Sequence, residues 1–126
     1  MSKVIIAIVI LSIILTAGIL ECIFVENTFS ELNVRLEEIK KSLQENNVAV
    51  ALERTDSTIE WWEKKRHKME IITFSPDLRL LSVSFGETKG SLESDDIKNA
   101  MSKIESIFCI SNNLRENLNF NLQDII

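Results

Sequence analysis

The stretch Val4 to Leu20, VIIAIVILSIILTAGIL, is an unbroken apolar run, and the rest of the chain is organised around it. A helix rises about 1.5 Å per residue and the bilayer core is about 30 Å thick, so a span needs roughly 20 apolar residues. The run is slightly short, and Cys22 to Val25 completes it, with Glu21 at headgroup level where its carboxylate reaches water. We predict one transmembrane helix in residues 1–25, in contact with the lipid bilayer through Val4 to Leu20.

A cleaved signal peptide is the alternative interpretation of this segment. Signal peptides have a basic start, a short apolar region and small residues before the cleavage site. Thr16 and Gly18 fit the last requirement, but the apolar run is longer than most signal cores and continues beyond Gly18. We therefore prefer an uncleaved anchor, and a secreted helical protein is the alternative.

The orientation of the span follows from its flanking charges, because basic residues resist translocation. Lys3 and the terminal amine precede the apolar run, whereas acidic residues come first after it and Arg35 is the nearest following cation. This pattern predicts a single-pass protein of the cell membrane, with a cytoplasmic N-terminus and an extracytoplasmic domain in residues 26–126.

The charge balance bears on the partners of that domain. The 126 residues include 14 Lys and Arg against 19 Asp and Glu, a formal net charge of −5, and Lys3 and Glu21 cancel within the anchor. An acidic domain argues against nucleic acid as a partner. Two cysteines and one histidine are too few for a disulfide scaffold or for most His/Cys metal sites. Three glycines and one proline leave few turn signals, which favours long helices.

An apolar stripe with helical spacing follows the anchor. Its members are separated by alternating steps of three and four residues, and they are Phe29, Leu32, Leu36, Ile39 and Leu43. This is a heptad pattern on a helix that continues out of the membrane. About three heptads are marginal for a two-chain coiled coil, so we predict packing on later helices of the same chain. A homodimer through the Phe29 to Leu43 stripe is the alternative.

Asn46 and Asn47 mark the first break, because asparagine suits turns and helix starts. We predict one long second helix from Val48 to Phe74, although the polar residues Asp56 to Thr58 would also suit a bend. Its apolar positions are Val48, Leu52, Ile59, Trp62, Met69 and Ile72.

Ser75, Pro76 and Asp77 mark the next boundary, since serine caps a helix and proline suits its first turn. Residues 81–85 alternate apolar side chains with serine, a period of two that suits a strand. A lone strand has no pairing partner. We therefore predict a third helix that begins at Pro76 and ends near Gly86 to Gly90.

Ser94, Asp95 and Asp96 are typical capping residues and predict a fourth helix that runs to about Leu114. Its apolar face consists of Ile97, Met101, Ile104, Ile107 and Phe108. The apolar residues in the last ten positions suggest that the terminus docks. The predicted fold is all-α, with a transmembrane helix continuous with a long helix and then a small antiparallel helical bundle. The predicted contacts of the bundle are Leu32, Leu36, Ile39, Trp62, Ile104 and Phe108.

The sequence contains no recognisable catalytic set. His67 lies in a run of four cations, without a carboxylate in that run to orient it, and is predicted to be a surface residue. Cys109 lies between apolar neighbours, where a thiol usually behaves as a small buried group. No Gly-rich phosphate loop and no Cys-x-x-Cys spacing occurs. We therefore expect no enzymatic activity, no catalytic residues, no cofactor and no metal site.

The run from Lys64 to Lys68 is the strongest local charge, and Trp61 and Trp62 precede it. Cations beside aromatic rings suit anionic headgroups or wall polymers. The alternative is a solvated helix face balanced by nearby glutamates, with Trp62 in the core. We prefer this second interpretation.

Three stretches carry a family resemblance: Trp62-Glu63-Lys64-Lys65, the boundary from Phe74 to Asp77, and the end from Asn117 to Ile126. With the single N-terminal span, they resemble an uncharacterised family of short, single-span bacterial membrane proteins, domain of unknown function 4363. The resemblance covers most of the chain. Family members often carry a histidine near the boundary, where Ser75-Pro76-Asp77 stands here. The family has no known activity, so the resemblance implies only a membrane-anchored helical protein.

These features predict a membrane-anchored helical interaction or structural module at the bacterial cell envelope, with an envelope protein as its partner. A sensory or regulatory membrane module is the alternative function, because a membrane helix that leads into a bundle can transmit shifts. The chain contains no output domain of its own.

Overall fold

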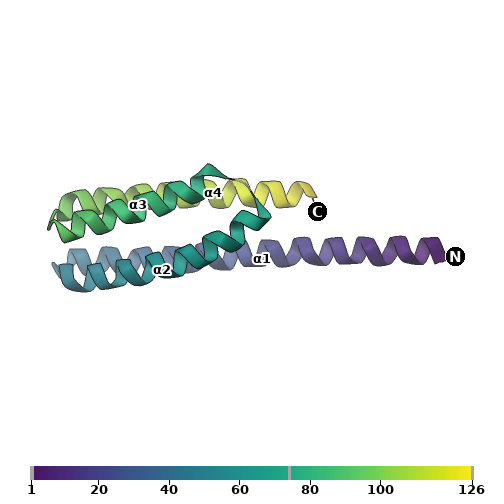
Figure 1. Ribbon diagram of the computed structural model, residues 1–126, viewed down its shortest axis with the longest axis horizontal. Coiled ribbons are helices and arrows are strands. Elements are labelled where there is room, and N and C mark those ends of the chain that lie inside the picture. Colours follow the sequence, from purple (N-terminus) through teal and green to yellow (C-terminus); the bar gives the residue numbers. More distant parts are fainter. Residues whose placement is uncertain (1, 74, 126) are drawn as a thin grey trace.

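The structure, a computed structural model, describes residues 2–73 and 75–125, and the side chains of residues 2–73 and 75–118. The described residues form four helices and no strand: α1 (Ser2–Gln44), α2 (Val48–Ile72), α3 (Pro76–Glu93) and α4 (Ile97–Ile125) (Figure 1). The predicted all-α class is confirmed.

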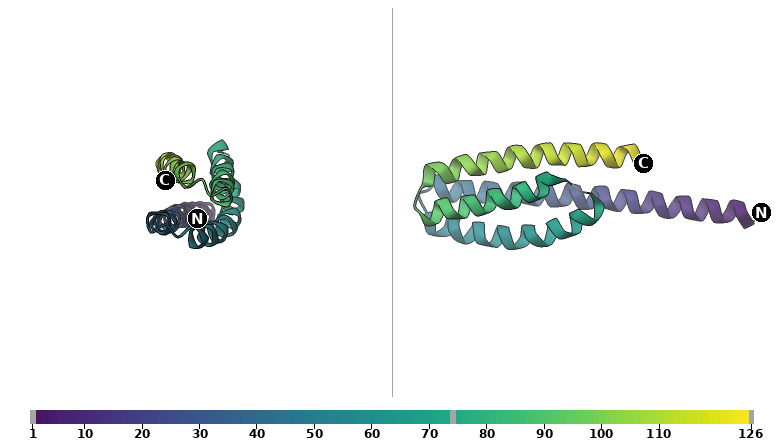
Figure 2. Two further views of the ribbon diagram at one scale, coloured as in Figure 1. Left: turned by 90° about the vertical axis from the view of Figure 1, so that its left-hand side faces the viewer. Right: turned by 45° about the horizontal axis from the view of Figure 1, so that its top comes forward.

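The helices form an antiparallel bundle in which α1 and α3 each contact both α2 and α4 (Figures 1 and 2). α1 is one uninterrupted helix of 43 residues whose N-terminal part projects beyond the bundle. α4 continues past the α2–α3 connection and runs alongside α1, toward the N-terminus of α1 (Figure 2). The predicted continuity between the apolar helix and the first bundle helix is therefore confirmed.

The heptad stripe of α1 forms one wall of the core. All five of its side chains, from Phe29 to Leu43, are buried by the other helices of the same chain. Intramolecular packing of the stripe is therefore confirmed. A homodimer through the same residues stays a prediction, and it would require the bundle to open.

The core has two apolar clusters that follow each other along the bundle. The cluster nearer the projecting end of α1 includes Phe29, Leu32, Leu36, Trp62, Met69, Leu78, Leu81, Phe85, Ile107, Leu114 and Leu118. The distal cluster contains Ile39, Leu43, Ala51, Leu92, Ala100 and Ile104. On α2 and α3 the two clusters are separated by buried threonines. The hydroxyl groups of Thr55, Thr58 and Thr88 donate to the carbonyl four residues earlier, at 2.7, 2.8 and 2.8 Å, so their burial leaves no unpaired donor.

The α1–α2 and α3–α4 turns use the same backbone device. Asn46 and Asp95 have φ values of 59° and 58°, the left-handed conformation that ends many helices. The next residue then caps the following helix. The side-chain oxygen of Asn47 accepts from the Val50 amide at 3.3 Å, and that of Asp96 accepts from the Asn99 amide at 3.1 Å.

The two turns belong to an internal repeat that the sequence predictions missed. Ser42–Ala51 reads SLQENNVAVA and Ser91–Ala100 reads SLESDDIKNA, an offset of 49 residues. The first two residues and the last residue of each copy are buried, and they are Ser42, Leu43 and Ala51 in the first copy and Ser91, Leu92 and Ala100 in the second. The bundle therefore consists of two similar hairpins, α1–α2 and α3–α4, packed side by side.

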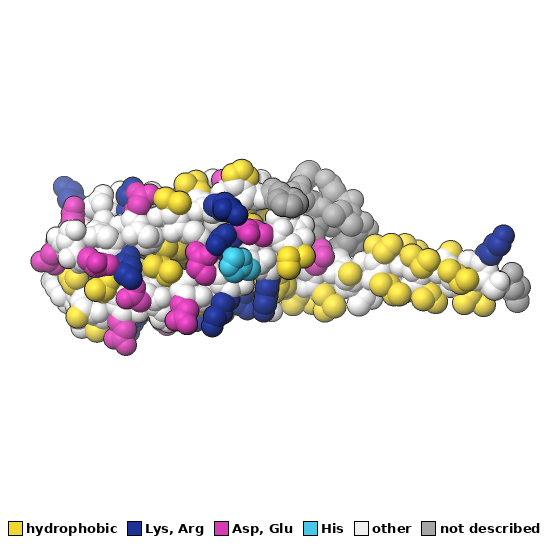
Figure 3. Space-filling model, in the orientation of Figure 1, with side chains coloured by type: hydrophobic (Ala, Val, Ile, Leu, Met, Phe, Trp, Pro, Cys, Tyr) yellow, Lys and Arg dark blue, Asp and Glu magenta, His cyan; other side chains and the backbone are white. Residues whose placement is uncertain are grey.

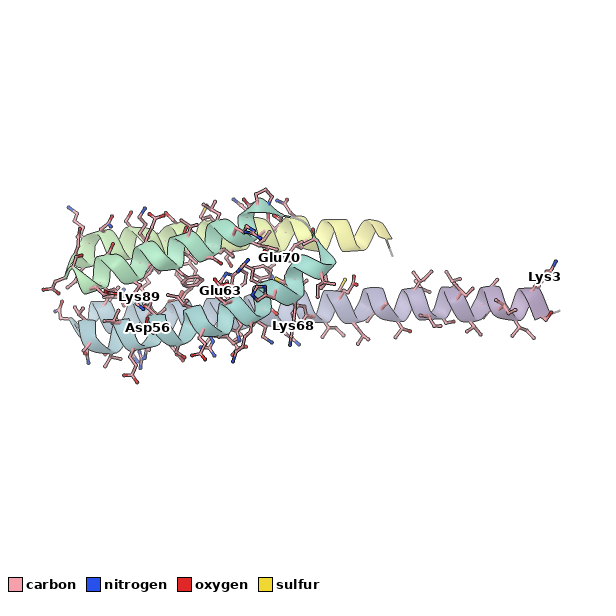
Figure 4. All side chains as sticks on the ribbon, in the orientation of Figure 1. Lys3, Asp56, Glu63, Lys68, Glu70 and Lys89 are labelled. Carbon is pink, nitrogen blue, oxygen red and sulfur yellow. The ribbon has the colours of Figure 1, made fainter. Side chains whose placement is uncertain are left out.

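The same offset relates two ion pairs that join the hairpins. Lys40 on α1 lies 2.9 Å from Glu105 on α4, and Lys89 on α3 lies 2.9 Å from Asp56 on α2 (Figure 4). The hydrogen bond to the carboxylate raises the pKa of each lysine. The inter-hairpin contacts thus have an approximate twofold relation.

Three helix ends differ from the predictions. α2 ends at Ile72, and Phe74, the predicted end, lies outside the described residues. α3 continues to Glu93, past the predicted end at Gly86 to Gly90, because both glycines face open space and are tolerated within the helix. α4 continues to Ile125 rather than ending near Leu114, since the intervening sequence contains no glycine or proline. The predicted choice of helix over strand for residues 81–85 is confirmed.

Candidate functional site

The projecting part of α1 carries a sheath of exposed apolar side chains. The large apolar residues from Val4 to Leu20 are 38–62% exposed, and the helix is long and apolar enough to cross a membrane. Figure 3 shows hydrophobic side chains around this projection, whereas charged side chains of both signs cover the bundle. This surface is typical of a helix whose solvent is lipid.

The polar side chains of the sheath are satisfied within the helix. The Ser12 hydroxyl donates to the Ile8 carbonyl at 2.9 Å, and the Thr16 hydroxyl donates to the Ser12 carbonyl at 2.8 Å. Such bonds remove the penalty for placing a hydroxyl group in hydrocarbon. Ser12 and Thr16 are therefore compatible with a bilayer.

The sheath passes into the bundle without a linker. Cys22 and Phe24 are partly buried against the core, and Val25 is 1% exposed. Packing of the bundle thus begins within the last residues of the predicted anchor. The carboxylate of Glu26 on α1 accepts hydrogen bonds from the guanidinium of Arg115 on α4, which raises the pKa of Arg115. This contact joins α4 to α1 near the base of the projection, and α4 continues beyond Arg115 to Ile125.

The basic run of α2 lies beside the same point. The Lys65 Nζ atom is 5.5 Å from the centre of the Phe24 ring. A surface hollow of about 270 Å³ is lined by Leu20, Glu21, Phe24, Lys68 and Ile72. Figure 4 shows Lys68 on the part of α2 that crosses α1, where the projection begins. The antiparallel fold thus brings the Lys64 to Lys68 run to the base of the apolar sheath.

Arg66 is the one cation of this run that is engaged in a strong network. Its guanidinium donates to the carboxylates of Glu63 and Glu70, and Arg79 on α3 lies 3.6 Å from Glu70. Burial alone would raise the pKa of Glu63, but hydrogen bonds from Arg66 and Ser82 outweigh it and hold that pKa below its usual value. The network stabilises the ionised form of Glu63.

The two tryptophans have different environments. Trp62 is fully buried, as predicted, and its indole Nε1 donates to the Ser82 hydroxyl at 3.0 Å. Trp61 is partly exposed, and the Arg35 guanidinium lies 4.8 Å from its ring centre. Trp62 therefore serves packing, while Trp61 belongs to the surface of the basic run.

The predicted chemistry-bearing residues do not come together. His67 is exposed, as predicted, whereas Cys109 is also exposed, so its predicted burial is wrong. Ile107 points into the core, and helical geometry directs a side chain two residues later away from it. Among the described residues, no group of three or more His, Cys, Asp or Glu side chains could hold a metal ion.

Comparison of the chain with protein-family models, with curated proteins and with solved structures gives no match. The candidate site therefore rests on the arrangement of this chain's own residues. It is the place where the apolar sheath, the Glu26–Arg115 pair and the Lys64 to Lys68 run of α2 meet. The sequence predictions noted the sheath and the basic run but did not connect them. A signal was available, because a hairpin that turns at Asn46 returns residues near 68 to the level of residues near 24.

Proposed function

We propose that this chain is a membrane-anchored helical module of the bacterial cell envelope. α1 serves as an uncleaved anchor, and the bundle serves as an interaction or structural domain on the outer face, without catalytic activity of its own. The observation that supports this most is the single helix that carries an exposed apolar sheath at one end and a buried stripe at the other.

The absence of a linker within α1 gives the module a mechanical property. A continuous helix transmits position and rotation directly, so the bundle has a defined orientation on the bilayer. The charge asymmetry at the ends of the sheath supports an outward-facing bundle, since Lys3 lies at the far end of the projection (Figure 4). A protein partner in the envelope would meet a fixed surface rather than a tethered domain.

Membrane extraction tests the anchor. Ile10 and Ile14 are each 52% exposed on the sheath, and Val34, on the bundle part of the same helix, is 55% exposed. A carboxylate at the centre of a span costs about 3 kcal/mol on insertion scales. The double variant Ile10→Asp/Ile14→Asp should therefore leave the membrane fraction during an alkaline wash, whereas Val34→Asp should remain with the natural protein. Equal retention of all three proteins would contradict the proposal.

The partner is tested by affinity capture from membranes that carry the inserted full-length protein. A stable complex with a component of the envelope or of a secretion system supports an interaction or structural module. Capture of a kinase or receptor instead supports the second candidate, a regulatory module, which the uninterrupted path from span to bundle also favours. A mature protein that begins near Ile19 would replace both with a secreted helical protein.

A further inference from the structure

We infer that the membrane-proximal end of the bundle is a docking surface for anionic phospholipid headgroups of the bilayer that α1 spans. The surface consists of Lys64, Lys65 and Lys68, which supply charge, and Ile71, which inserts. This inference rests on the proposed anchoring by α1 and extends it, because it gives the bundle a second contact with the membrane.

The lysines lie at the end of the bundle from which the apolar sheath projects. Lys65 lies over the Phe24 ring, and Lys68 lines a hollow together with Leu20 and Phe24. Both lysines are therefore at the end of the apolar sheath that is nearest the bundle. If Val4 to Leu20 fills the hydrocarbon core, these ammonium groups stand at the level of the lipid phosphates. Figure 3 shows Lys and Arg side chains gathered where the hydrophobic projection enters the bundle.

The positive charge of these lysines is largely uncompensated. Among the described residues, neither Lys65 nor Lys68 forms an ion pair, and Lys64 makes only an exposed contact of 4.0 Å with Glu60. Of the carboxylates at this end of the bundle, Glu63 and Glu70 are bound by Arg66, Glu21 lies beside Lys68 in the hollow, and Asp77 lies in the first turn of α3. An anionic lipid surface attracts lysines that lie within a Debye length of it.

An exposed apolar side chain lies at the same end of the bundle. Ile71, three residues after Lys68, is 86% exposed, more than the large apolar side chains of the sheath itself. It lies in the last turn of α2, immediately before the α2–α3 connection. An isoleucine beside lysines at the end of a membrane-proximal helix matches the interfacial pattern in which apolar side chains enter the headgroup boundary.

The test uses the full chain in phosphatidylcholine vesicles, with or without phosphatidylglycerol. A polarity-sensitive fluorophore is attached to Ser75→Cys in a Cys22→Ser/Cys109→Ser background. Ser75 lies in the α2–α3 connection, and its side chain makes no capping hydrogen bond, so the substitution leaves the start of α3 intact. Docking moves the fluorophore into a less polar environment, and we expect a blue shift of its emission only when phosphatidylglycerol is present.

Charge removal should reverse this shift. Each lysine near an anionic surface contributes about fivefold to binding, so Lys64→Gln/Lys68→Gln should lower the ratio of docked to undocked protein about thirtyfold. The matched control is Lys41→Gln/Lys98→Gln, which removes two exposed lysines at the opposite end of the bundle and should leave the emission unchanged. Ile71→Ser should also reduce the shift, with the helical circular dichroism preserved.

Flotation of the vesicles separates the two claims. Protein that fails to float with either lipid contradicts the anchor, and the docking surface falls with it. Alternatively, the protein floats with both lipids while its emission is unchanged by phosphatidylglycerol or by the Lys64/Lys68 substitutions. This result would support the anchor and contradict the docking surface.

Discussion

At the scale of single residues, the two cysteines are the most useful reporters. Cys109 is exposed on α4, and Cys22 is partly buried where α1 joins the bundle. A membrane-impermeant maleimide applied to intact cells should therefore label Cys109 faster than Cys22. Cys109→Ser should remove most of the label and Cys22→Ser should remove little.

If the label is instead lost in Cys22→Ser and kept in Cys109→Ser, the exposed position of Cys109 on α4 would be contradicted. Labelling that appears only after permeabilisation would place the bundle in the cytoplasm and would contradict the orientation inferred from Lys3.

The buried residues show how far apolar periodicity predicts a core. Leu32, Leu36, Ile39, Trp62 and Ile104 are buried as predicted, and Phe108 is only partly buried. Several of the core positions that were missed are small or carry a hydroxyl group, among them Ala51, Thr55, Thr58, Thr88 and Ala100. Threonine interrupts a hydrophobic pattern in the sequence, but in a helix its hydroxyl bonds the preceding turn and its methyl group packs like that of valine.

At the scale of helices, the two turns provide a paired test. Asn46 and Asp95 have positive φ values, which asparagine and aspartate tolerate better than alanine does. Asn46→Ala and Asp95→Ala should each lower the free energy of unfolding by about 1 kcal/mol, whereas glycine at either position should retain it. Denaturant titration of the full chain in detergent micelles measures this difference. Equal stability of the alanine and glycine variants would show that the turns are not left-handed.

The Glu63 network provides a prediction about pH. Because the pKa of Glu63 is lowered in the folded protein, its ionised form stabilises the fold above the ordinary carboxyl pKa. That contribution is lost as the pH falls through the lowered, folded-state pKa. Glu63→Gln should therefore reduce stability at neutral pH, by up to about 1 kcal/mol for a partly exposed pair, and should flatten the acid limb of a stability–pH curve.

The matched control for this experiment is Glu53→Gln, which removes an exposed carboxylate from the same helix. If the acid limb is equally steep in the Glu63→Gln and Glu53→Gln proteins, Glu63 does not contribute to the pH dependence of stability.

Helix existence was predictable from the sequence, and helix length was not. The helix starts after Asn47 and Asp96 follow from side-chain capping that acts within one turn. The start after Ser75 follows instead from Pro76, because proline suits the first turn of a helix. The ends of α3 and α4 depend on tertiary packing. Leu92 and Leu118 are buried beyond the predicted ends, so tertiary contacts support the last turns of two helices whose local sequence only tolerates the helical conformation.

For the molecule as a whole, two hairpins with similar turns form the bundle, and the first hairpin carries the apolar projection of α1. The Lys40–Glu105 and Lys89–Asp56 pairs hold the hairpins in register at equivalent places. The repeat was visible in the sequence as SLQENNVAVA and SLESDDIKNA. A single repeat of ten residues is a weak signal until the structure shows that both copies form a turn with the same backbone conformation and the same cap.

Spin-label accessibility along α1 tests whether this helix spans the membrane. Single cysteines, introduced in a Cys22→Ser/Cys109→Ser background at exposed positions of α1, carry a nitroxide in vesicles that contain the full chain. The account predicts that labels at Ile10, Ile14 and Leu20 collide with oxygen and not with a water-soluble nickel complex. Labels at Asn27 and Val34 should show the reverse, with the change between Leu20 and Asn27. Equal access of the nickel complex to all five positions would contradict a membrane-spanning α1.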